Sequence, residues 1–105
     1  MISLVNFTFS NLKYVLLIYL DENLIEIIET NSFFNLTNVN LISLKNNRIK
    51  FVEDHSFSSL NIEYSLELFG NKNLSKISPF SFSNVSFSHL SYESVVSLKT
   101  SFYSY

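Results

Sequence analysis

The sequence contains no cysteine, no alanine, one glycine and one proline in 105 residues. Without cysteine, the chain can form neither a disulfide scaffold nor a thiolate metal site. The lack of alanine argues against a helix bundle, because alanine is the best helix former and the 19 serines and 13 asparagines compete with the helix backbone. A single glycine also excludes a glycine-rich loop of the kind that binds phosphate.

Charge and long apolar runs are scarce as well. Charged residues make up 15% of the chain and the net charge is −2, so no basic surface for nucleic acid is expected. The longest apolar run, from Tyr14 to Leu20, is far shorter than the roughly 20 residues that cross a bilayer as a helix. Asp21 and Glu22 follow this run where a signal peptide needs small residues. We therefore expect neither a signal peptide nor a membrane-inserting segment in this chain, which leaves an intracellular location open.

What the sequence does contain is an internal repeat. Asn23, Asn47 and Asn71 recur with a 24-residue period. Apolar residues recur three, five and eight residues before the first two asparagines, and two, five and ten residues after them. Around Asn71 one extra residue follows the asparagine, and Glu63 takes the position eight residues before it, with Ile62 beside it. The recurring apolar residues are Val15, Ile18, Leu20, Ile25, Ile28 and Phe33; Val39, Ile42, Leu44, Ile49, Val52 and Phe57; and Leu66, Leu68, Leu74, Ile77 and Phe82.

This spacing predicts a solenoid. The apolar alternation before each asparagine, as in residues 18–20, predicts a short strand with one buried face. Such a strand is too short to be stable alone and is expected to pair in parallel with the same strand of the next coil. An asparagine side chain carries both a donor and an acceptor, so Asn23, Asn47 and Asn71 are predicted to form a structural ladder that binds the backbone of neighbouring coils.

Three stretches of the chain carry a family resemblance. The runs VLLIYLDENLIEIIETNSF, VNLISLKNNRIKFVEDHSF and SLELFGNKNLSKISPFSF resemble leucine-rich repeats, and the 24-residue period with a closing phenylalanine is similar to the class common in animal extracellular proteins. The resemblance covers about residues 9–85. It implies an α/β-type leucine-rich-repeat solenoid of about three full coils plus partial end coils. Short parallel β-strands are expected on its concave face, and irregular or short helical turns on its convex face.

The repeat also divides the chain. We expect a partial N-terminal repeat at residues 1–8, then repeats at 9–32, 33–56 and 57–81, then a degenerate C-terminal repeat and tail at 82–105. In the last of these, Leu90 and Tyr92 are candidates for a fourth strand and Val95 takes the place of the asparagine. Solenoid ends need a polar cover, and neither end carries a recognisable capping module. We therefore expect a marginally stable fragment of a longer array.

The resemblance implies a role in binding other proteins, and the concave face is where we expect the partner. Neighbouring strands lie about 4.8 Å apart, so Asp21 is predicted to stand beside Lys45. Exposed apolar and aromatic side chains on a sheet typically mark an interaction site. The predicted partner-binding residues are Leu17, Tyr19, Asp21, Leu41, Lys45, Tyr64, Glu67 and Phe69.

Catalytic and metal sites are not expected. Asp54-His55-Ser56 has the residue types of a catalytic triad, but adjacent residues cannot converge as a triad requires. His55 and His89 are the only histidines, and without cysteine they would need carboxylates to complete a zinc site. The acidic residues between positions 21 and 29 lack the spacing of a calcium loop. We predict no catalytic residue, no metal, no cofactor and no enzymatic activity.

Four sequons would accept N-linked glycans in a secreted chain: Asn6, Asn35, Asn73 and Asn84. About three are expected by chance at this content of asparagine, serine and threonine, so the sequons permit an extracellular location without arguing for one.

Two hypotheses for function follow. The leading one is a protein-binding module, a fragment of a receptor or adhesion-type protein at the cell surface or outside the cell, which recognises a protein partner through its concave sheet. The alternative is a structural spacer or self-associating segment of a longer array, because open solenoid ends are unpaired edges that invite association.

Overall fold

The computed structural model describes residues 2–87; the expected fourth strand around Leu90 and Tyr92, Val95, His89 and the tail lie outside this range. Nine strands are present in the described chain. They are β1 (Ile2–Leu4), β2 (Phe9–Ser10), β3 (Leu17–Tyr19), β4 (Ile25–Ile28), β5 (Phe33–Ser43), β6 (Phe51–Val52), β7 (Phe57–Glu67), β8 (Lys76–Ile77) and β9 (Phe82–Phe87).

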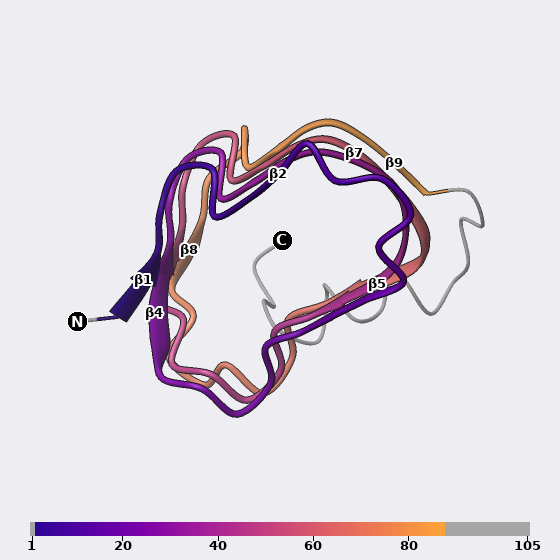
Figure 1. Ribbon diagram of the computed structural model, residues 1–105. Coiled ribbons are helices and arrows are strands. Elements are labelled where there is room, and N and C mark those ends of the chain that lie inside the picture. Colours follow the sequence, from indigo (N-terminus) through magenta and orange to yellow (C-terminus); the bar gives the residue numbers. More distant parts are fainter. Residues whose placement is uncertain (1, 88–105) are drawn as a thin grey trace.

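The strands form two parallel sheets that enclose one core. The short-strand sheet has the order β1-β4-β6-β8, and the long-strand sheet has the order β2-β5-β7-β9 with β3 also paired to β5. Viewed along the solenoid axis, the short-strand sheet makes the left wall and the long-strand sheet bends round the top and right (Figure 1). The chain thus winds through about four turns, at residues 2–24, 25–48, 49–73 and 74–87. The predicted parallel-strand solenoid is confirmed.

Equivalent residues of successive turns stand in register. Ile18 pairs with Ile42, and Ile42 with Leu66, as the repeat predicts. On the other wall Ile28 pairs with Val52, and Val52 pairs with Ile77, one position beyond the 24-residue period. The extra residue after Asn71 therefore lies in the corner between the third and fourth turns, and the strands of the fourth turn pair with their equivalents in the third.

The register between β5 and β7 shifts by one position and then returns. Val39 pairs with Ile62, one position short of the 24-residue period, with an irregularity on either side of that pair. The shift places the fully buried Ile62 in the core, where the repeat position itself is occupied by Glu63. A bulge can re-aim a side chain in this way, because one extra residue on one strand changes which residues face inward.

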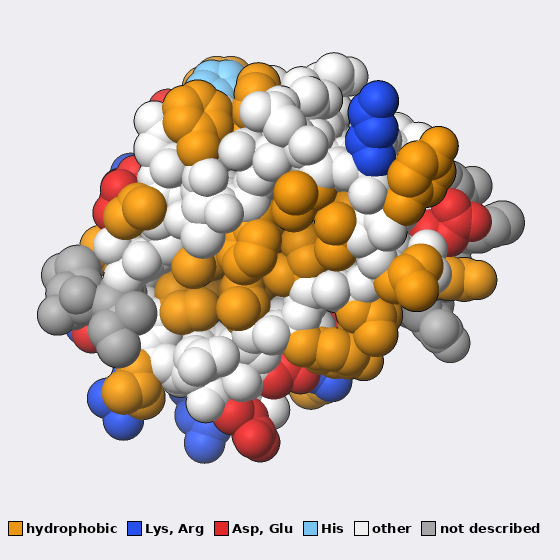
Figure 2. All heavy atoms as spheres, viewed as in Figure 1, with side chains coloured by type: hydrophobic (Ala, Val, Ile, Leu, Met, Phe, Trp, Pro, Cys, Tyr) orange, Lys and Arg blue, Asp and Glu red, His pale blue; other side chains and the backbone are white. Residues whose placement is uncertain are grey.

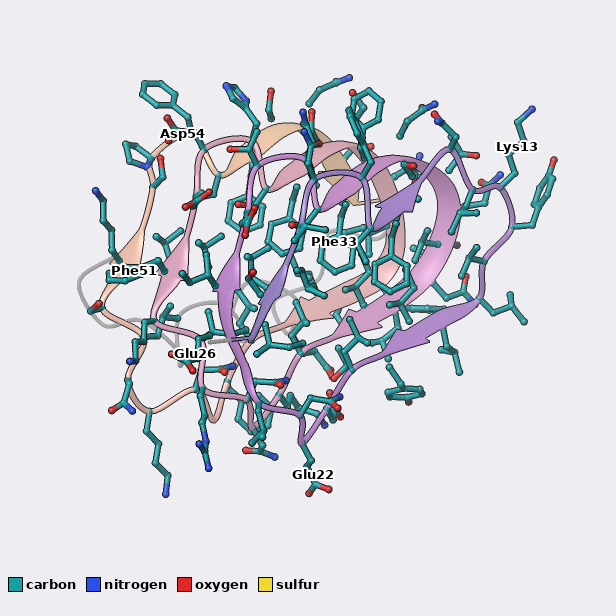
Figure 3. All side chains as sticks on the ribbon, turned by 60° about the vertical axis from the view of Figure 1, so that its left-hand side comes forward. Lys13, Glu22, Glu26, Phe33, Phe51 and Asp54 are labelled. Atoms are coloured by element: carbon teal, nitrogen blue, oxygen red, sulfur yellow. The ribbon has the colours of Figure 1, made fainter. Side chains whose placement is uncertain are left out.

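The core is a set of stacked columns. Phe9, Phe33, Phe57 and Phe82 stack with ring centroids 5.3, 5.0 and 5.1 Å apart and planes within 12° of parallel. Figure 3 shows the ring of Phe33 inside the turn, between the two sheets. Near-parallel rings at this spacing are offset stacks, which add stabilisation beyond the area that they bury.

The convex side of the turns differs from the expectation of irregular or short helical turns. Within residues 2–87 the structure has no helix, and the convex side is a second parallel sheet built from β1, β4, β6 and β8. The reason lies in the residues: Ile25, Ile27 and Ile28 in β4 and Val52 in β6 are β-branched and favour extended backbone. Each short strand then pairs with an equivalent strand of the next turn.

Asparagine is the most frequent residue where the described backbone is left-handed. Among residues 2–87 eleven non-glycine residues have positive φ, and six of them are asparagine, the residue other than glycine that most readily adopts this conformation. Several form columns, such as Asn11, Asn35, Ser59 and Asn84 with φ between 55° and 57°. In a chain with one glycine, asparagine thus supplies about half of the left-handed positions that the described turns require.

Candidate functional site: the concave face

The concave face is the outward side of β3 and of the carboxyl-terminal parts of β5 and β7. Leu17 pairs with Leu41 across β3 and β5, and Leu41 pairs with Ser65 of β7. Their neighbours Ile18, Ile42 and Leu66 point inward and are buried. Strand alternation therefore divides each segment into one core side and one outward side.

Four of the predicted binding residues give this face apolar area. Leu17 is 51% exposed, Tyr19 61% and Tyr64 57%, while Leu41 is half-buried between its neighbours. These side chains stand on paired strands, so their positions are set by the sheet rather than by a mobile loop. A rigid apolar and aromatic surface can bind a partner with little loss of conformational entropy.

The other four predicted residues form a cluster at the carboxyl ends of the same strands. Lys45 Nζ lies 3.9 Å from Asp21 Oδ2, 3.7 Å from Glu67 Oε1 and 5.4 Å from the centre of the Phe69 ring. The Oδ1 atom of Asp21 accepts hydrogen bonds from the Ser43 hydroxyl at 2.5 Å and the Lys45 backbone N–H at 3.0 Å. The carboxylates are thus occupied by groups of this chain, and the predicted neighbourhood of Asp21 and Lys45 is present.

The three ladder asparagines lie at the corner where the concave strands end. Asn47 Nδ2 donates to the carbonyl oxygens of Leu20 and Leu44, at 2.9 and 3.1 Å, and its Oδ1 accepts the Ile25 N–H at 3.2 Å. It therefore bonds its own turn and the preceding one.

The other two asparagines differ from each other. Asn71 repeats the arrangement of Asn47. Its Nδ2 donates to the carbonyl oxygens of Leu44 and Leu68, and its Oδ1 accepts the N–H of Ile49. Asn23 is exposed and donates within its own turn, to the carbonyl oxygens of Leu20 and Asp21.

A comparison with known families decides what this solenoid is. The family model described as "Leucine rich repeat" matches residues 18–72, just over half of the chain. The chain belongs to the leucine-rich repeat family. No curated protein and no solved structure matches it. Leucine-rich repeats are in general a non-enzymatic fold that commonly binds proteins. The matched segment includes all three ladder asparagines and every predicted binding residue except Leu17.

The leucine-rich repeat has a second polar column, which sequence reasoning missed. Ser32, Ser56 and Ser81 are fully buried at the corner opposite the asparagines, each one residue before a core phenylalanine. Ser32 Oγ donates to Leu4 O at 2.9 Å, and Ser56 Oγ donates to Ile28 O at 3.1 Å. Each serine thus ties two turns together. The signal was a serine or threonine before every closing phenylalanine, and the high serine content concealed it.

The residues of the Asp54-His55-Ser56 sequence do not converge in this leucine-rich repeat. Ser56 is buried and donates to carbonyl oxygens, whereas Asp54 and His55 are exposed. Asp54 accepts a hydrogen bond from the Ser78 hydroxyl. Within residues 2–87 no group of three or more histidine, aspartate or glutamate side chains is placed to hold a metal ion. Nor does that part of the chain contain a helix that could span a membrane.

All four sequon asparagines are exposed: Asn6, Asn35, Asn73 and Asn84. Asn35 and Asn84 belong to the same left-handed column on the long-strand sheet. The Nδ2 group of Asn35 donates to Asn11 Oδ1 at 2.8 Å.

Proposed function

We propose that this leucine-rich repeat binds a protein partner through its concave face, mainly by apolar and aromatic contact. The observation that carries the proposal is the division of the face into two parts. Leu17, Tyr19 and Tyr64 present apolar area, while the charged groups Asp21 and Glu67 already interact with Lys45. Aromatic anchors on a fixed scaffold are the side chains that carry most of the energy of protein interfaces.

This division also defines the chemistry of the partner. Since the charged side chains of the face are paired within the chain, we expect a partner with an apolar surface and an affinity that depends weakly on salt. Phe69, beside the Lys45 ammonium, extends the aromatic area to the corner. A partner selected by charge would instead lose affinity steeply as ionic strength rises.

The experiment uses site-specific crosslinking and then titration. A photo-crosslinking amino acid at Tyr19 or at Tyr64 is expected to capture the same protein, whereas one at Phe51 on the short-strand sheet is the matched control and should not. The captured protein is then titrated with the purified chain. Replacing Tyr19, Tyr64 and Phe69 together by alanine should weaken binding about 10⁴-fold, since each anchor is worth about 2 kcal/mol and every 1.4 kcal/mol is tenfold.

Unchanged affinity of the triple variant would overturn the proposal, provided that its circular dichroism and melting match those of the parent chain. Equal crosslinking from Phe51 would place the partner elsewhere on the solenoid. Replacing Phe51 by alanine should leave the affinity unchanged.

We further propose that the parent molecule is a receptor or adhesion-type protein of the 24-residue class, located outside the cell or at its surface. The proposal is supported by the similarity of the repeat period to the class common in animal extracellular proteins, and the four sequon asparagines are exposed, as glycan acceptors must be. When the chain is directed through a secretory pathway, an endoglycosidase should reduce its apparent mass. The reduction should disappear when the four asparagines are replaced by glutamine. Absence of glycan on the secreted parent chain would contradict the proposal.

A second candidate function, self-association, is favoured by the distribution of apolar surface. Eight of the twelve exposed large apolar side chains in the described chain belong to the first turn, residues 2–24. They are Val5, Phe7, Leu12, Tyr14, Leu16, Leu17, Tyr19 and Leu24.

A further inference from the structure

Basic side chains gather where each turn passes from the long-strand sheet to the short-strand sheet. Four of the six lysines and arginines in residues 2–87 lie at this corner or on the strand that follows it: Arg48, Lys50, Lys72 and Lys76. Lysine and arginine side chains project from the lower edge of the molecule in Figure 2, which is this corner in Figure 1. A chain with a net charge of −2 thus carries a local positive surface, which we call the basic corner.

Successive turns bring the four cations together. Arg48 and Lys50 are exposed on either side of the buried Ile49. In the next turn, Lys72 follows its ladder asparagine at the position that Arg48 has one turn earlier. The N–H of Lys76 donates to the carbonyl oxygen of Lys50 at 3.2 Å, so these two residues also belong to neighbouring turns. Because paired strands lie about 4.8 Å apart, one extended ligand can reach cations of both turns.

Most of the positive charge of the basic corner is uncompensated. Lys50 pairs with Glu26 of the preceding turn at 3.4 Å. Arg48, Lys72 and Lys76 form no ion pair with any residue that the structure describes. The basic corner differs in this respect from the charged cluster of the concave face, where lysine and carboxylates already interact. Three of its four cations are therefore available to an anionic ligand.

A groove of about 460 Å³ crosses the corner beside these cations. Arg48 and Lys72 line it together with Asn46 and Asn73. The amide side chains of the two asparagines make no hydrogen bond to another described residue. Glu22, which points outward from the corner in Figure 3, is the one carboxylate among the described residues of the lining. A ligand in the groove thus meets two cations and two amides that can bind it.

We propose that the basic corner binds a sulfated polysaccharide, with sulfates on the cations and sugar hydroxyls on the amides. The guanidinium of Arg48 can donate two parallel hydrogen bonds to one sulfate, while the lysine ammonium groups bind further sulfates as point charges. An asparagine amide can both donate to and accept from a hydroxyl group. A polymer that carries sulfates and hydroxyls on the same chain satisfies both kinds of side chain.

Other polyanions match this corner less well. Basic grooves that bind single-stranded nucleic acid also offer aromatic rings for stacking, and no aromatic side chain is among the described residues that line this groove. An anionic membrane gains only about 1 kcal/mol from each basic residue near its surface, and Glu22 and Glu26 would oppose that attraction. The groove shares no residue with the proposed protein-binding face, so the inference goes beyond the proposed function and is tested separately.

Heparin is the probe, and the full chain is produced without glycans so that Asn73 is unmodified. The affinity of the unaltered chain should fall roughly eightfold when the salt concentration doubles, as expected when three or four cations displace counterions from a polyanion. Lys72→Gln should reduce this loss to roughly fourfold, because one counterion fewer is displaced. Lys13→Gln is the matched control: it removes one charge from an exposed lysine that forms no ion pair with a described residue, and it should leave the roughly eightfold loss unchanged.

Asn73→Ala separates a polysaccharide from a simple polyanion, because it removes an amide and no charge. It should weaken heparin binding about threefold and leave the binding of polyphosphate, which lacks sugar hydroxyls, unchanged. Circular dichroism should show the same fold for all three variants, since each position is exposed. An unaltered chain that does not bind heparin overturns the inference. So do equal effects of Lys72→Gln and Lys13→Gln, or tighter binding of polyphosphate than of heparin at equal salt.

Discussion

The first and second turns of the solenoid carry similar side chains at equivalent positions and differ in what covers them. Leu12 is 37% exposed, whereas Leu36, its equivalent in the second turn, is fully buried. Phe9 stacks on one ring, whereas Phe33 stacks on two, those of Phe9 and Phe57. Burial in a solenoid is therefore supplied by the neighbouring turns, and an end turn with a core-type sequence remains partly exposed.

The largest effect is expected when the core phenylalanine of either turn is replaced by alanine. Phe33→Ala should lower the free energy of unfolding by about 3–5 kcal/mol, because it leaves a cavity enclosed by two neighbouring rings. Phe9→Ala should cost about 1–2 kcal/mol, because Phe9 is partly exposed and no closed cavity forms. Urea denaturation of both variants measures the difference. Equal losses would show that the two turns are equally enclosed.

A second test compares the ladder asparagines. Asn47→Ala should cost about 1–3 kcal/mol, because the Ile25 N–H and the Leu20 carbonyl lose a buried partner. Asn23→Ala should cost about 0.5 kcal/mol, since its side chain is exposed and bonds only nearby carbonyls. Thermal unfolding followed by circular dichroism would compare them. A larger effect at Asn23 would contradict the assignment of cross-turn bonds to Asn47.

A smaller effect on stability is expected from substitutions at the left-handed corners of the turns. Glu22, Asn46 and Gly70 occupy one column with φ of 58°, 57° and 85°. Gly70→Ala should destabilise by about 1–2 kcal/mol, because the added Cβ would collide with Oδ1 of Asn46 and the conformation disfavours a side chain. Glu22→Gly should instead stabilise the chain by up to about 1 kcal/mol, because it relieves the left-handed penalty. Opposite signs in chemical denaturation are the expected result.

The smallest effect concerns the charged cluster of the concave face. Lys45→Met should change the free energy of unfolding by at most about 1 kcal/mol, because its ion pairs with Asp21 and Glu67 are partly exposed. The loss should shrink in high salt, which denaturation at two ionic strengths would detect. Lys50→Met, which removes the ion pair with Glu26 beside the other sheet, is the matched control for the salt dependence. A loss independent of salt would indicate packing of the Lys45 stem instead.

The sequence predicted the register because burial imposes a strict order on apolar residues. The pairing of Ile18 with Ile42 and of Ile42 with Leu66 followed directly from their spacing. Ile62 could be suspected as the substitute for Glu63, but the bulge that turns it inward depends on neighbouring strands.

Other features could not be predicted so readily. The strands of the convex side are two to four residues long, and a local preference for extended backbone over so few residues forms a strand only when the equivalent residues of other turns pair with it. The buried serine column was not predicted because the sequence has 19 serines in 105 residues, and only their place before a core phenylalanine distinguishes the three of this column from the rest. The outward position of Tyr19 followed from strand alternation and that of Tyr64 from its place in the repeat, whereas the paired state of Asp21, Lys45 and Glu67 required the side-chain geometry.

The extra residue after Asn71 shows where this architecture tolerates changes of length. Most strand pairs before it keep the 24-residue period, with Val39 and Ile62 an exception, and the pairs that span it are one position longer, so that Val52 still meets Ile77. Lys72 and Asn73 at this corner are exposed, so added chain can bulge into solvent without disturbing the layers on either side. Duplication and slippage during evolution could thus lengthen the protein at such corners, and a peptide tag grafted there would be carried as a harmless outgrowth.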